Sequence, residues 1–180
     1  MKKVMLLGIN SKFVHTNIAI RYIKKYVEKY SDIEIEIFEK TINNHVEEII
    51  ADIYRKKPEI LMISAYIWNS EYVYKLITEV KKVFKNLTLV LGGPEVSYNA
   101  IELMNKYNEI DYIISGEGEK TTLEFLTKDK KDVKGLYYRE EDKIKFGGIR
   151  EGICDLDEIP FPYEVEEFSE KGKIFYYESS

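Results

Sequence analysis

The feature that most constrains this chain is a regular alternation of short apolar runs and longer amphipathic segments over its first 128 residues. Each short run has the character of a buried strand and is followed by a segment with helical periodicity. Alternation of this kind favours right-handed crossovers and a parallel sheet with helices on both faces. The strand-like runs are 4–9, 33–38, 60–64, 87–91 and 110–114, and the helical segments begin at 17, 44, 69, 97 and 119.

The five runs differ in their expected depth within the sheet. Residues 60–64 are almost entirely apolar, which is typical of a central strand, whereas 33–38 alternates isoleucine with glutamate, which favours an edge. We therefore predict an α/β fold with a doubly wound, five-stranded parallel sheet, Rossmann- or flavodoxin-like, in the order 2-1-3-4-5. Asn44 and Glu47 have the spacing of a helix capping box.

The last part of the chain has a different texture. Residues 133–139 and 143–146 predict an antiparallel hairpin, and the glycines and prolines that follow interrupt regular structure. A strand-like run at 173–180 closes the sequence. We therefore divide the chain into a domain over residues 1–130 and a β-hairpin with an irregular tail over residues 131–180.

Composition excludes several classes of protein. The 180 residues contain one cysteine, Cys154, which excludes an internal disulfide, a cysteine-rich zinc site and an iron–sulfur cluster held by this chain alone. A net charge of −5 and only four arginines, scattered along the sequence, argue against a nucleic-acid partner. The sequence has neither a secretory signal nor an apolar run long enough for a membrane span, so we expect no membrane partner and a cytoplasmic location.

Four loops follow the carboxyl ends of expected strands and are rich in glycine, asparagine, serine and aromatic residues. In open parallel sheets, ligands bind at this edge, near the point where the strand order reverses. The loops together therefore predict a ligand cleft. The candidate cofactor-binding residues are Asn10, Ser11, Lys12, Phe13, His15, Ser64, Tyr66, Trp68, Asn69, Gly92, Gly93, Pro94, Glu95, Gly116, Glu117 and Gly118.

The same loops exclude several nucleotide and phosphotransfer chemistries. Gly116 and Gly118 begin like a dinucleotide fingerprint, but Thr121 stands where the third glycine belongs, and no GxxxxGK[ST] loop occurs. A phosphoacceptor receiver domain shares the expected topology but needs acidic residues where this chain has Asn10 and Ser64. No catalytic triad or Cys–His pair can be assembled, so we assign no catalytic residue.

The sequence alone leaves open the roles of His15 and Trp68, whereas His45 has one preferred interpretation. His15 is an axial metal ligand, a hydrogen-bond donor to a ligand, or a residue near a helix start. Trp68, beside Tyr66, either stacks on a flat cofactor or closes the cleft by ordinary packing. His45 is expected to be structural, and two histidines with one distant cysteine do not make a zinc site.

Five motifs follow one another along almost the whole chain. They are the stretches 7–15, 63–69, 90–95, 111–119 and 155–162, which include Gly-Gly-Pro, Gly-Glu-Gly-Glu and Leu-Asp-Glu-Ile-Pro. In this order they resemble the N-terminal cobalamin-binding domain of class B radical SAM proteins. That group includes methyltransferases and anaerobic magnesium-protoporphyrin IX monomethyl ester oxidative cyclase-like proteins.

The resemblance implies that cobalamin is held over the carboxyl edge of the sheet. Its nucleotide tail would enter beside Ser64, Gly92 and Gly93, and its corrin ring would meet the first and third loops. Many cobalamin domains bind cobalt through the histidine of a DxHxxG motif, and the loop at 10–16 lacks that spacing. His15 therefore remains a candidate cobalt ligand without a motif to support it.

The resemblance also implies a larger enzyme. We expect the full-length protein to continue into a radical SAM barrel that binds S-adenosylmethionine and a [4Fe–4S] cluster, and to act as a methyltransferase or an oxidative cyclase-like enzyme. This chain alone is then expected to bind cobalamin without turnover. The rival hypothesis is a flavodoxin-like protein-interaction domain with no bound cofactor. A flavin or nucleotide site is a third alternative, disfavoured because the first loop lacks phosphate donors.

Overall fold

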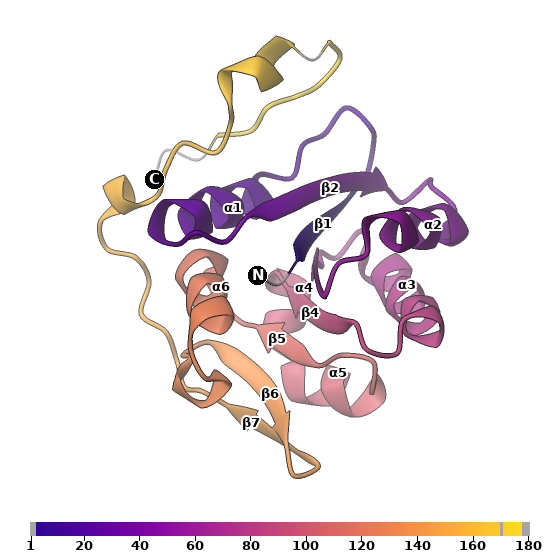
Figure 1. Cartoon of the computed structure of the whole chain (residues 1–180), viewed down its shortest axis with the longest axis vertical. Coiled ribbons are helices and arrows are strands. Elements are labelled where there is room, and N and C mark those ends of the chain that lie inside the picture. The colour runs from indigo at the N-terminus through magenta and orange to yellow at the C-terminus, as the bar shows by residue number, and fades with distance from the viewer. Residues whose placement is uncertain (1–2, 170, 178–180) are drawn as a thin grey trace.

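One mixed β-sheet with helices on both faces organises the chain (Figure 1). The computed structural model describes residues 3–169 and 171–177. The seven strands lie in the order β2-β1-β3-β4-β5-β6-β7, with β1 to β5 parallel to one another and β6 and β7 antiparallel to their neighbours. The strands are β1 (Val4–Asn10), β2 (Ile35–Thr41), β3 (Ile60–Ser64), β4 (Thr88–Gly92), β5 (Tyr112–Ile114), β6 (Leu136–Glu140) and β7 (Lys143–Phe146).

The helices divide between the two faces of the sheet. Because side chains alternate along a strand, Leu6 and Met62 face α1 and α6, while Leu7 and Ile63 face the helices on the other side. Figure 1 shows α1 and α6 on one side of the sheet and α2 and α3 on the other. The helices are α1 (Ile18–Tyr30), α2 (Val46–Lys56), α3 (Ser70–Val83), α4 (Pro94–Ser97), α5 (Ala100–Lys106) and α6 (Gly118–Thr127).

Local sequence explains where two of these helices begin and end. The Asn17 side chain caps α1 by accepting a hydrogen bond from the backbone N–H of Ile20 at 3.3 Å. At the far end of α2, Lys57 adopts a left-handed conformation with φ of 49°. Pro58 follows directly and cannot continue a helix, so the chain turns there into β3.

The expected count of five strands is wrong, because the C-terminal hairpin belongs to the main sheet. β6 pairs antiparallel with β5, with Tyr112 opposite Tyr138, and β7 then pairs with β6. The hairpin thereby covers the edge that β5 would otherwise leave open. The five parallel strands themselves lie in the order β2-β1-β3-β4-β5.

Two expected helical details also differ. The single helix expected from residue 97 is divided between α4 and α5. The capping box at Asn44 and Glu47 does not form, because α2 begins at Val46 and the Asn44 side-chain oxygen Oδ1 accepts a hydrogen bond from the Thr41 backbone N–H at 3.0 Å. Asparagine side chains often compete in this way for backbone groups in turns.

Beyond β7 the chain returns across the molecule and runs along α1 (Figure 1). It contacts the last residue of α1, Tyr30, which donates to the Glu158 carbonyl, and further on the loop before α1, where Thr16 donates to the Ile174 carbonyl. The expected strand at 173–180 is reduced to one bridge, between Ile174 and His15, within the part described up to residue 177. Residues 178–180 of that expected strand lie outside the described residues.

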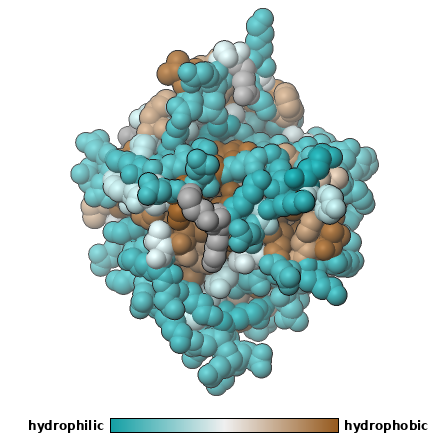
Figure 2. All heavy atoms as spheres, in the orientation of Figure 1, coloured by the Kyte–Doolittle hydropathy of each residue, from teal (hydrophilic) through white to brown (hydrophobic). Residues whose placement is uncertain are grey.

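The surface on the side seen in Figure 1 is mostly hydrophilic. Figure 2 shows hydrophilic side chains over most of this face, with hydrophobic side chains visible in the seams between them. Within residues 3–169 and 171–177, no helix combines the length and apolar character needed to cross a bilayer.

Candidate cofactor-binding site

A row of small residues crosses the carboxyl edge of the sheet on the side of α1 and α6. Gly8 lies opposite Ser64 in the register of β1 and β3, and Ser64 lies opposite Gly92 in that of β3 and β4. The row provides little side-chain volume above the apolar layer beneath it. That layer, two residues earlier in each strand, consists of Leu6, Met62 and Val90.

A cavity of about 460 Å³ opens between this row and the helices α1 and α6. Its volume lies in the usual range of small-molecule sites, and most of its wall is apolar. Such a wall accepts a flat apolar group and leaves orientation to a few polar atoms. The lining comprises Leu6, Ala19, Ile20, Ile23, Met62, Ile63, Ser64, Tyr66, Val90, Leu91, Gly92, Gly93, Pro94, Ser97, Tyr98, Ile114, Ser115, Gly116, Glu117, Gly118, Glu119 and Thr122.

The adjacent glycines at the end of β4 have different reasons to be glycine. A Cβ at Gly93 would lie 2.5 Å from the carbonyl oxygen of Ala65, and the φ of +104° also favours glycine, so the protein itself requires this residue. A Cβ at Gly92 would come no closer to its protein neighbours than 3.8 Å, the distance to the Ile114 carbonyl oxygen. Because Gly92 follows Val90 by two residues, this Cβ would point to the cavity side. The missing side chain at Gly92 therefore enlarges the cavity without serving the packing of the chain.

A third glycine sets the distance between the two helices over the cavity. A Cβ at Gly118, the first residue of α6, would lie 2.8 Å from Cδ1 of Ile23 on α1. The absence of a side chain lets α6 approach α1 closely at the mouth of the cavity. Figure 1 shows these two helices side by side.

Buried amide groups fix the ends of the strands at the rim of the cavity. The Asn17 side chain donates to the Ser64 hydroxyl at 2.8 Å. The Asn69 side chain donates to the carbonyl oxygens of Ile9 at 2.9 Å and Ser64 at 3.2 Å, and accepts from the Tyr66 backbone at 2.8 Å. Asn69 thus joins the ends of β1 and β3 and holds the loop that follows β3. Its backbone carbonyl, rather than its side chain, begins the hydrogen bonding of α3.

A second hollow, of about 540 Å³, lies above the first loop. The rings of Tyr66 and Trp68 stack at a centroid distance of 4.4 Å and an interplanar angle of 10° on its wall, and Tyr66 also lines the deeper cavity. His15 lines the hollow too, and its Nδ1 shares a hydrogen bond with the hydroxyl of Tyr176 from the C-terminal segment. The stacked pair therefore connects the two spaces, while His15 is held by the tail.

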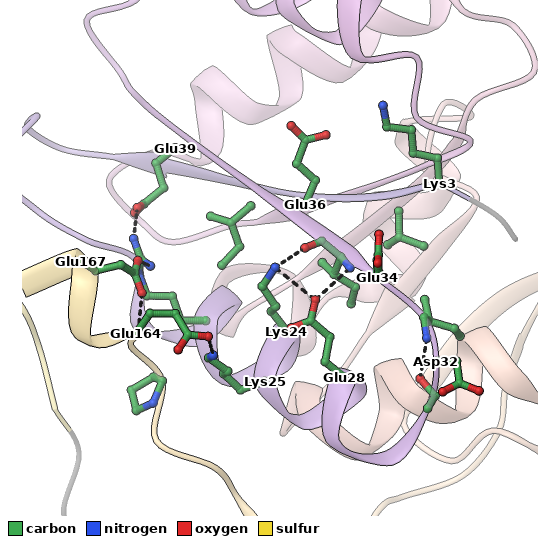
Figure 3. A pocket seen from close by; sticks show the side chains of 17 residues that line it. Lys3, Lys24, Lys25, Glu28, Asp32, Glu34, Glu36, Glu39, Glu164 and Glu167 are labelled. Atoms are coloured by element: carbon green, nitrogen blue, oxygen red, sulfur yellow. Dashed lines mark hydrogen bonds and ion pairs between the residues drawn. The ribbon is translucent and has the colours of Figure 1, made fainter.

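Charged residues tie the C-terminal segment to α1 and β2. Glu39 of β2 accepts from the Asn10 side chain at 3.0 Å, the Asn17 backbone at 2.6 Å and Arg21 at 2.6 Å. Arg21 also pairs with Glu167 of the tail (Figure 3). The groove of about 1230 Å³ shown in Figure 3 is lined by such paired charges, and we assign no ligand to it.

A further buried ion pair fastens the segment after β7 to α6. Arg150 donates to Thr121 Oγ1 at 2.7 Å and to the Lys134 carbonyl, and pairs with Glu124. Burial alone would raise the pKa of Glu124, but hydrogen bonds and charges from Arg150 and Lys128 together hold that pKa below its usual value. The pair stabilises α6 from behind, on the side away from the cavity lining.

The structure distributes the candidate cofactor-binding residues over these two spaces. Among them, the Glu117 carboxylate accepts a hydrogen bond from the Ile153 backbone N–H at 2.9 Å. The deeper cavity receives Ser64, Tyr66, Gly92, Gly93, Pro94, Gly116, Glu117 and Gly118. The upper hollow receives Asn10, Ser11, His15, Tyr66 and Trp68, whereas Lys12, Phe13, Asn69 and Glu95 line neither space.

The helix residues of the cavity wall are absent from the sequence-based candidates. Ala19 and Ile23 fall on the apolar stripe of α1 and were indistinguishable from core residues by periodicity alone. Thr122 could have been identified from the sequence, because it is one of two adjacent threonines that interrupt the apolar face of α6. Among the described residues, no group of three or more His, Cys, Asp or Glu side chains is placed to hold a metal ion.

Comparison with known proteins agrees with this geometry. Residues 4–126 match the family model described as B12 binding domain. An uncharacterised methyltransferase of Pyrococcus horikoshii is 28% identical over 81% of this chain and 32% of its own length. The cobalamin-dependent radical SAM methyltransferase TokK of Streptomyces tokunonensis is 28% identical over 59% of this chain and 17% of its own length. The anaerobic magnesium-protoporphyrin IX monomethyl ester cyclase of Synechocystis is 27% identical over 66% of this chain and 25% of its own length.

A solved structure shares the fold. The cobalamin-dependent S-adenosylmethionine radical enzyme OxsB, with aqua-cobalamin and S-adenosylmethionine bound, aligns with a TM-score of 0.75 and 17% identity over 90% of this chain and 24% of its own. The chain spans about a third or less of the length of the curated relatives it matches. Because the family model covers well over half of the sequence, the chain belongs to the B12-binding domain family and is a cobalamin-binding module similar to those of cobalamin-dependent radical SAM enzymes.

Proposed function

We propose that this chain holds cobalamin with its nucleotide base in the cavity beside Gly92, and that residues 1–130 form the unit that binds it. The space at Gly92 is the observation that carries the proposal, because the protein would accept a Cβ there and has none. The cavity of about 460 Å³ has the volume and the mostly apolar wall that a flat heteroaromatic base requires.

Each part of the lining contributes a distinct interaction. Ala19 and Ile23 of α1 exclude water from the base, and burial of apolar surface contributes roughly 25 cal/mol per Å². The Ser64 hydroxyl accepts from Asn17, so its own proton is available to an oxygen of the nucleotide tail. Gly92 lets that tail pass close to the backbone at the end of β4.

The loops above the sheet are suited to a large planar ring. Tyr66 and Trp68 already form a flat stacked pair at the boundary of the two hollows, and Asn10, Ser11 and His15 provide polar groups beside it. Bound cobalamin would supply a cobalt centre that carries a methyl group or tunes a radical step. The task of these residues is to orient that centre and to keep water away from it.

The complete protein is proposed to be an enzyme. The similarity to cobalamin-dependent radical SAM proteins supports a polypeptide in which residues 131–180 lead into a radical SAM domain with S-adenosylmethionine and a [4Fe–4S] cluster. The relatives include methyltransferases and a cyclase, so methyl transfer and an oxidative cyclase-like reaction are the two activities proposed for it. A cytoplasmic location is part of the same proposal.

The rival function, an interaction domain without a cofactor, would be favoured if Tyr66 and Trp68 filled the cleft. Tyr66 and Trp68 stack on each other instead, and Trp68 is half exposed. The cavity between α1 and α6 stays open beneath them. This arrangement favours the cofactor site over the interaction domain.

Fluorescence titration tests the proposal directly. Trp68 is the single tryptophan of the chain, lines the upper hollow and stacks on Tyr66, which also lines the cavity, so its emission reports on occupancy. We expect hydroxocobalamin and methylcobalamin to quench it with a 1:1 end point and a Kd below about 10 µM, with free N-acetyltryptophanamide as the inner-filter control. Absence of saturable quenching by both forms at tens of micromolar would contradict the proposal.

A further inference from the structure

An unpartnered hydroxyl belongs to the wall of the cofactor cavity. Thr122 of α6 is fully buried and lines the cavity, and its Oγ1 has no hydrogen-bond partner among the described residues. Nε of Arg21 is in the same state, but the remainder of that guanidinium pairs with Glu39 and Glu167. At Thr122 the one polar side-chain atom is unused.

Two other threonines of α6 behave differently. Thr121 donates to the Glu117 carbonyl at 3.2 Å, and Thr127 donates to the Leu123 carbonyl at 2.7 Å. Threonine in a helix commonly satisfies its hydroxyl through the carbonyl four residues earlier. Thr122 makes no such bond, so its hydroxyl retains its donor and acceptor capacity for a group inside the cavity.

Thr122 lies about one helical turn beyond the start of α6. Gly118 lies at the mouth of the cavity, and Thr122 follows it by four residues, about 6 Å further along the helix. The wall around it is formed by Ile20, Ile23 and the apolar layer of the sheet. A small number of polar atoms in a mostly apolar cavity fix the orientation of a flat ligand and select its chemistry.

We propose that Thr122 recognises the heteroaromatic base at the end of the cofactor's nucleotide tail by donating a hydrogen bond to a ring nitrogen whose lone pair is free. The inference rests on the proposed function, because it assumes that this end of cobalamin enters the cavity. Benzimidazole carries such a nitrogen when it is not bound to cobalt. A cobamide whose lower group is a phenol has no ring nitrogen, so it cannot accept this bond.

Three variants of the 180-residue chain separate this role from a structural one. Thr122→Val keeps the shape and removes the hydroxyl, Thr122→Ser keeps the hydroxyl, and Thr127→Val is the matched control on the same helix outside the cavity lining. Each is titrated with cobalamin, with a phenolyl cobamide and with cobinamide, which lacks the nucleotide base. Thermal unfolding is recorded without ligand.

We expect Thr122→Val to bind cobalamin about tenfold more weakly, corresponding to about 1.4 kcal/mol, and to bind cobinamide and the phenolyl cobamide as the wild type does. Thr122→Ser and Thr127→Val should bind cobalamin within about threefold of wild type. Without ligand, Thr122→Val should unfold at the wild-type temperature or about 2–4 °C higher, because it removes a buried unsatisfied hydroxyl.

Two results would overturn the inference while leaving the proposed function intact. They are wild-type affinity of Thr122→Val for cobalamin, and an equal loss of affinity for cobalamin and cobinamide. Failure of the wild-type chain to bind cobalamin at all would instead overturn the proposed function, and the inference with it.

Discussion

Ser64 and Gly92 face each other across β3 and β4, each as the last residue of its strand. Buried parallel strands normally carry large aliphatic side chains at such positions. Here the backbone hydrogen bonds between the strands continue to the edge of the sheet, but the residues there have small side chains or none on the side of α1 and α6. The site is therefore formed by omission of side chains within an otherwise regular sheet, and its rigidity is that of the sheet.

Substitution of Gly92 by alanine should separate binding from folding. The new Cβ would meet its nearest protein atom at 3.8 Å, so the free energy of unfolding should change by less than about 1 kcal/mol. The methyl group would occupy the cavity, so we predict at least about a tenfold loss of cobalamin affinity. Trp68 fluorescence and thermal unfolding of the same preparation measure the two quantities.

Gly93→Ala is the matched comparison. Its Cβ would lie 2.5 Å from the Ala65 carbonyl oxygen at a φ of +104°, so this variant should lose about 2 kcal/mol or more of unfolding free energy. The prediction for the pair is contradicted if Gly92→Ala unfolds as easily as Gly93→Ala, or binds cobalamin like the wild type.

The hydrogen bond between Asn17 and Ser64 should couple the start of α1 to the end of β3. Asn17 also caps α1, so Asn17→Ala should lose about 2 kcal/mol of unfolding free energy, and Ser64→Ala about 1 kcal/mol. In a double-mutant cycle by urea unfolding, we expect a coupling energy of about 1 kcal/mol. Strict additivity of the two single losses would show that the bond between them contributes nothing.

The sequence predicted the parallel core of the fold because the relevant signals are local. Apolar runs such as 60–64 and helical stripes with proper caps, as at Asn17, depend only on neighbouring residues. The pairing of β6 with β5 depends on contact between Tyr112 and Tyr138, which are distant in the sequence. Periodicity identifies both strands of the hairpin, yet it contains no information on which edge they will cover.

The sequence indicates the loop residues of the candidate site but not the helix residues that line it. Glycine and asparagine at the end of a strand, as at Gly92 and Asn10, indicate a ligand-binding loop, and these two residues line the deeper cavity and the upper hollow respectively. The sequence does not show that Ile23 lines the cavity, because a residue of a cavity wall and a residue of the core have the same kind of aliphatic side chain. Asn69 illustrates the opposite case, since its amide is taken up by backbone groups of β1 and the loop after β3.

Acid should weaken the attachment of the C-terminal segment through Glu124. Its pKa is held below the usual value despite burial, because Arg150 and Lys128 stabilise the carboxylate. A lowered folded-state pKa contributes stability above the unfolded-state pKa, and this contribution is lost as pH falls through the folded-state pKa. We predict that Glu124→Gln is less stable than wild type by about 3 kcal/mol near pH 7, and that the difference narrows progressively below about pH 4.5.

Urea unfolding at several pH values measures this difference, with Glu102→Gln, an exposed residue of α5, as the control for the substitution itself. A gap between wild type and Glu124→Gln that stays constant from neutral pH down to about pH 3 would show that the buried pair with Arg150 does not account for the lowered pKa.

Tyr163 should fasten the C-terminal segment to the first loop through its hydroxyl. That oxygen lies 3.2 Å from the Thr16 hydroxyl, donates to the Tyr176 carbonyl at 2.7 Å and accepts from the Tyr176 backbone N–H at 3.0 Å. Tyr163→Phe keeps the ring in its aromatic cluster and removes the partner of the Tyr176 backbone N–H and carbonyl, at a loss of about 1–3 kcal/mol. We predict faster amide exchange at Ile174, whose N–H donates to the Val14 carbonyl, with exchange in β3 unchanged. Equal acceleration in both places would indicate global destabilisation instead.

His15 should orient the tail rather than bind cobalt. Its Nδ1 shares a hydrogen bond with the Tyr176 hydroxyl, and the two rings stack with centroids 5.9 Å apart. Metal-binding imidazoles are usually held by a carboxylate, a backbone carbonyl or a water, whereas here the ring partner among the described residues is a phenol on the C-terminal segment. We therefore predict that His15→Gln leaves the electron paramagnetic resonance spectrum of the bound cobalt(II) form unchanged, while amide exchange at Ile174 accelerates. Axial nitrogen splitting that is present in the wild type and lost in the variant would identify His15 as the cobalt ligand and contradict the prediction.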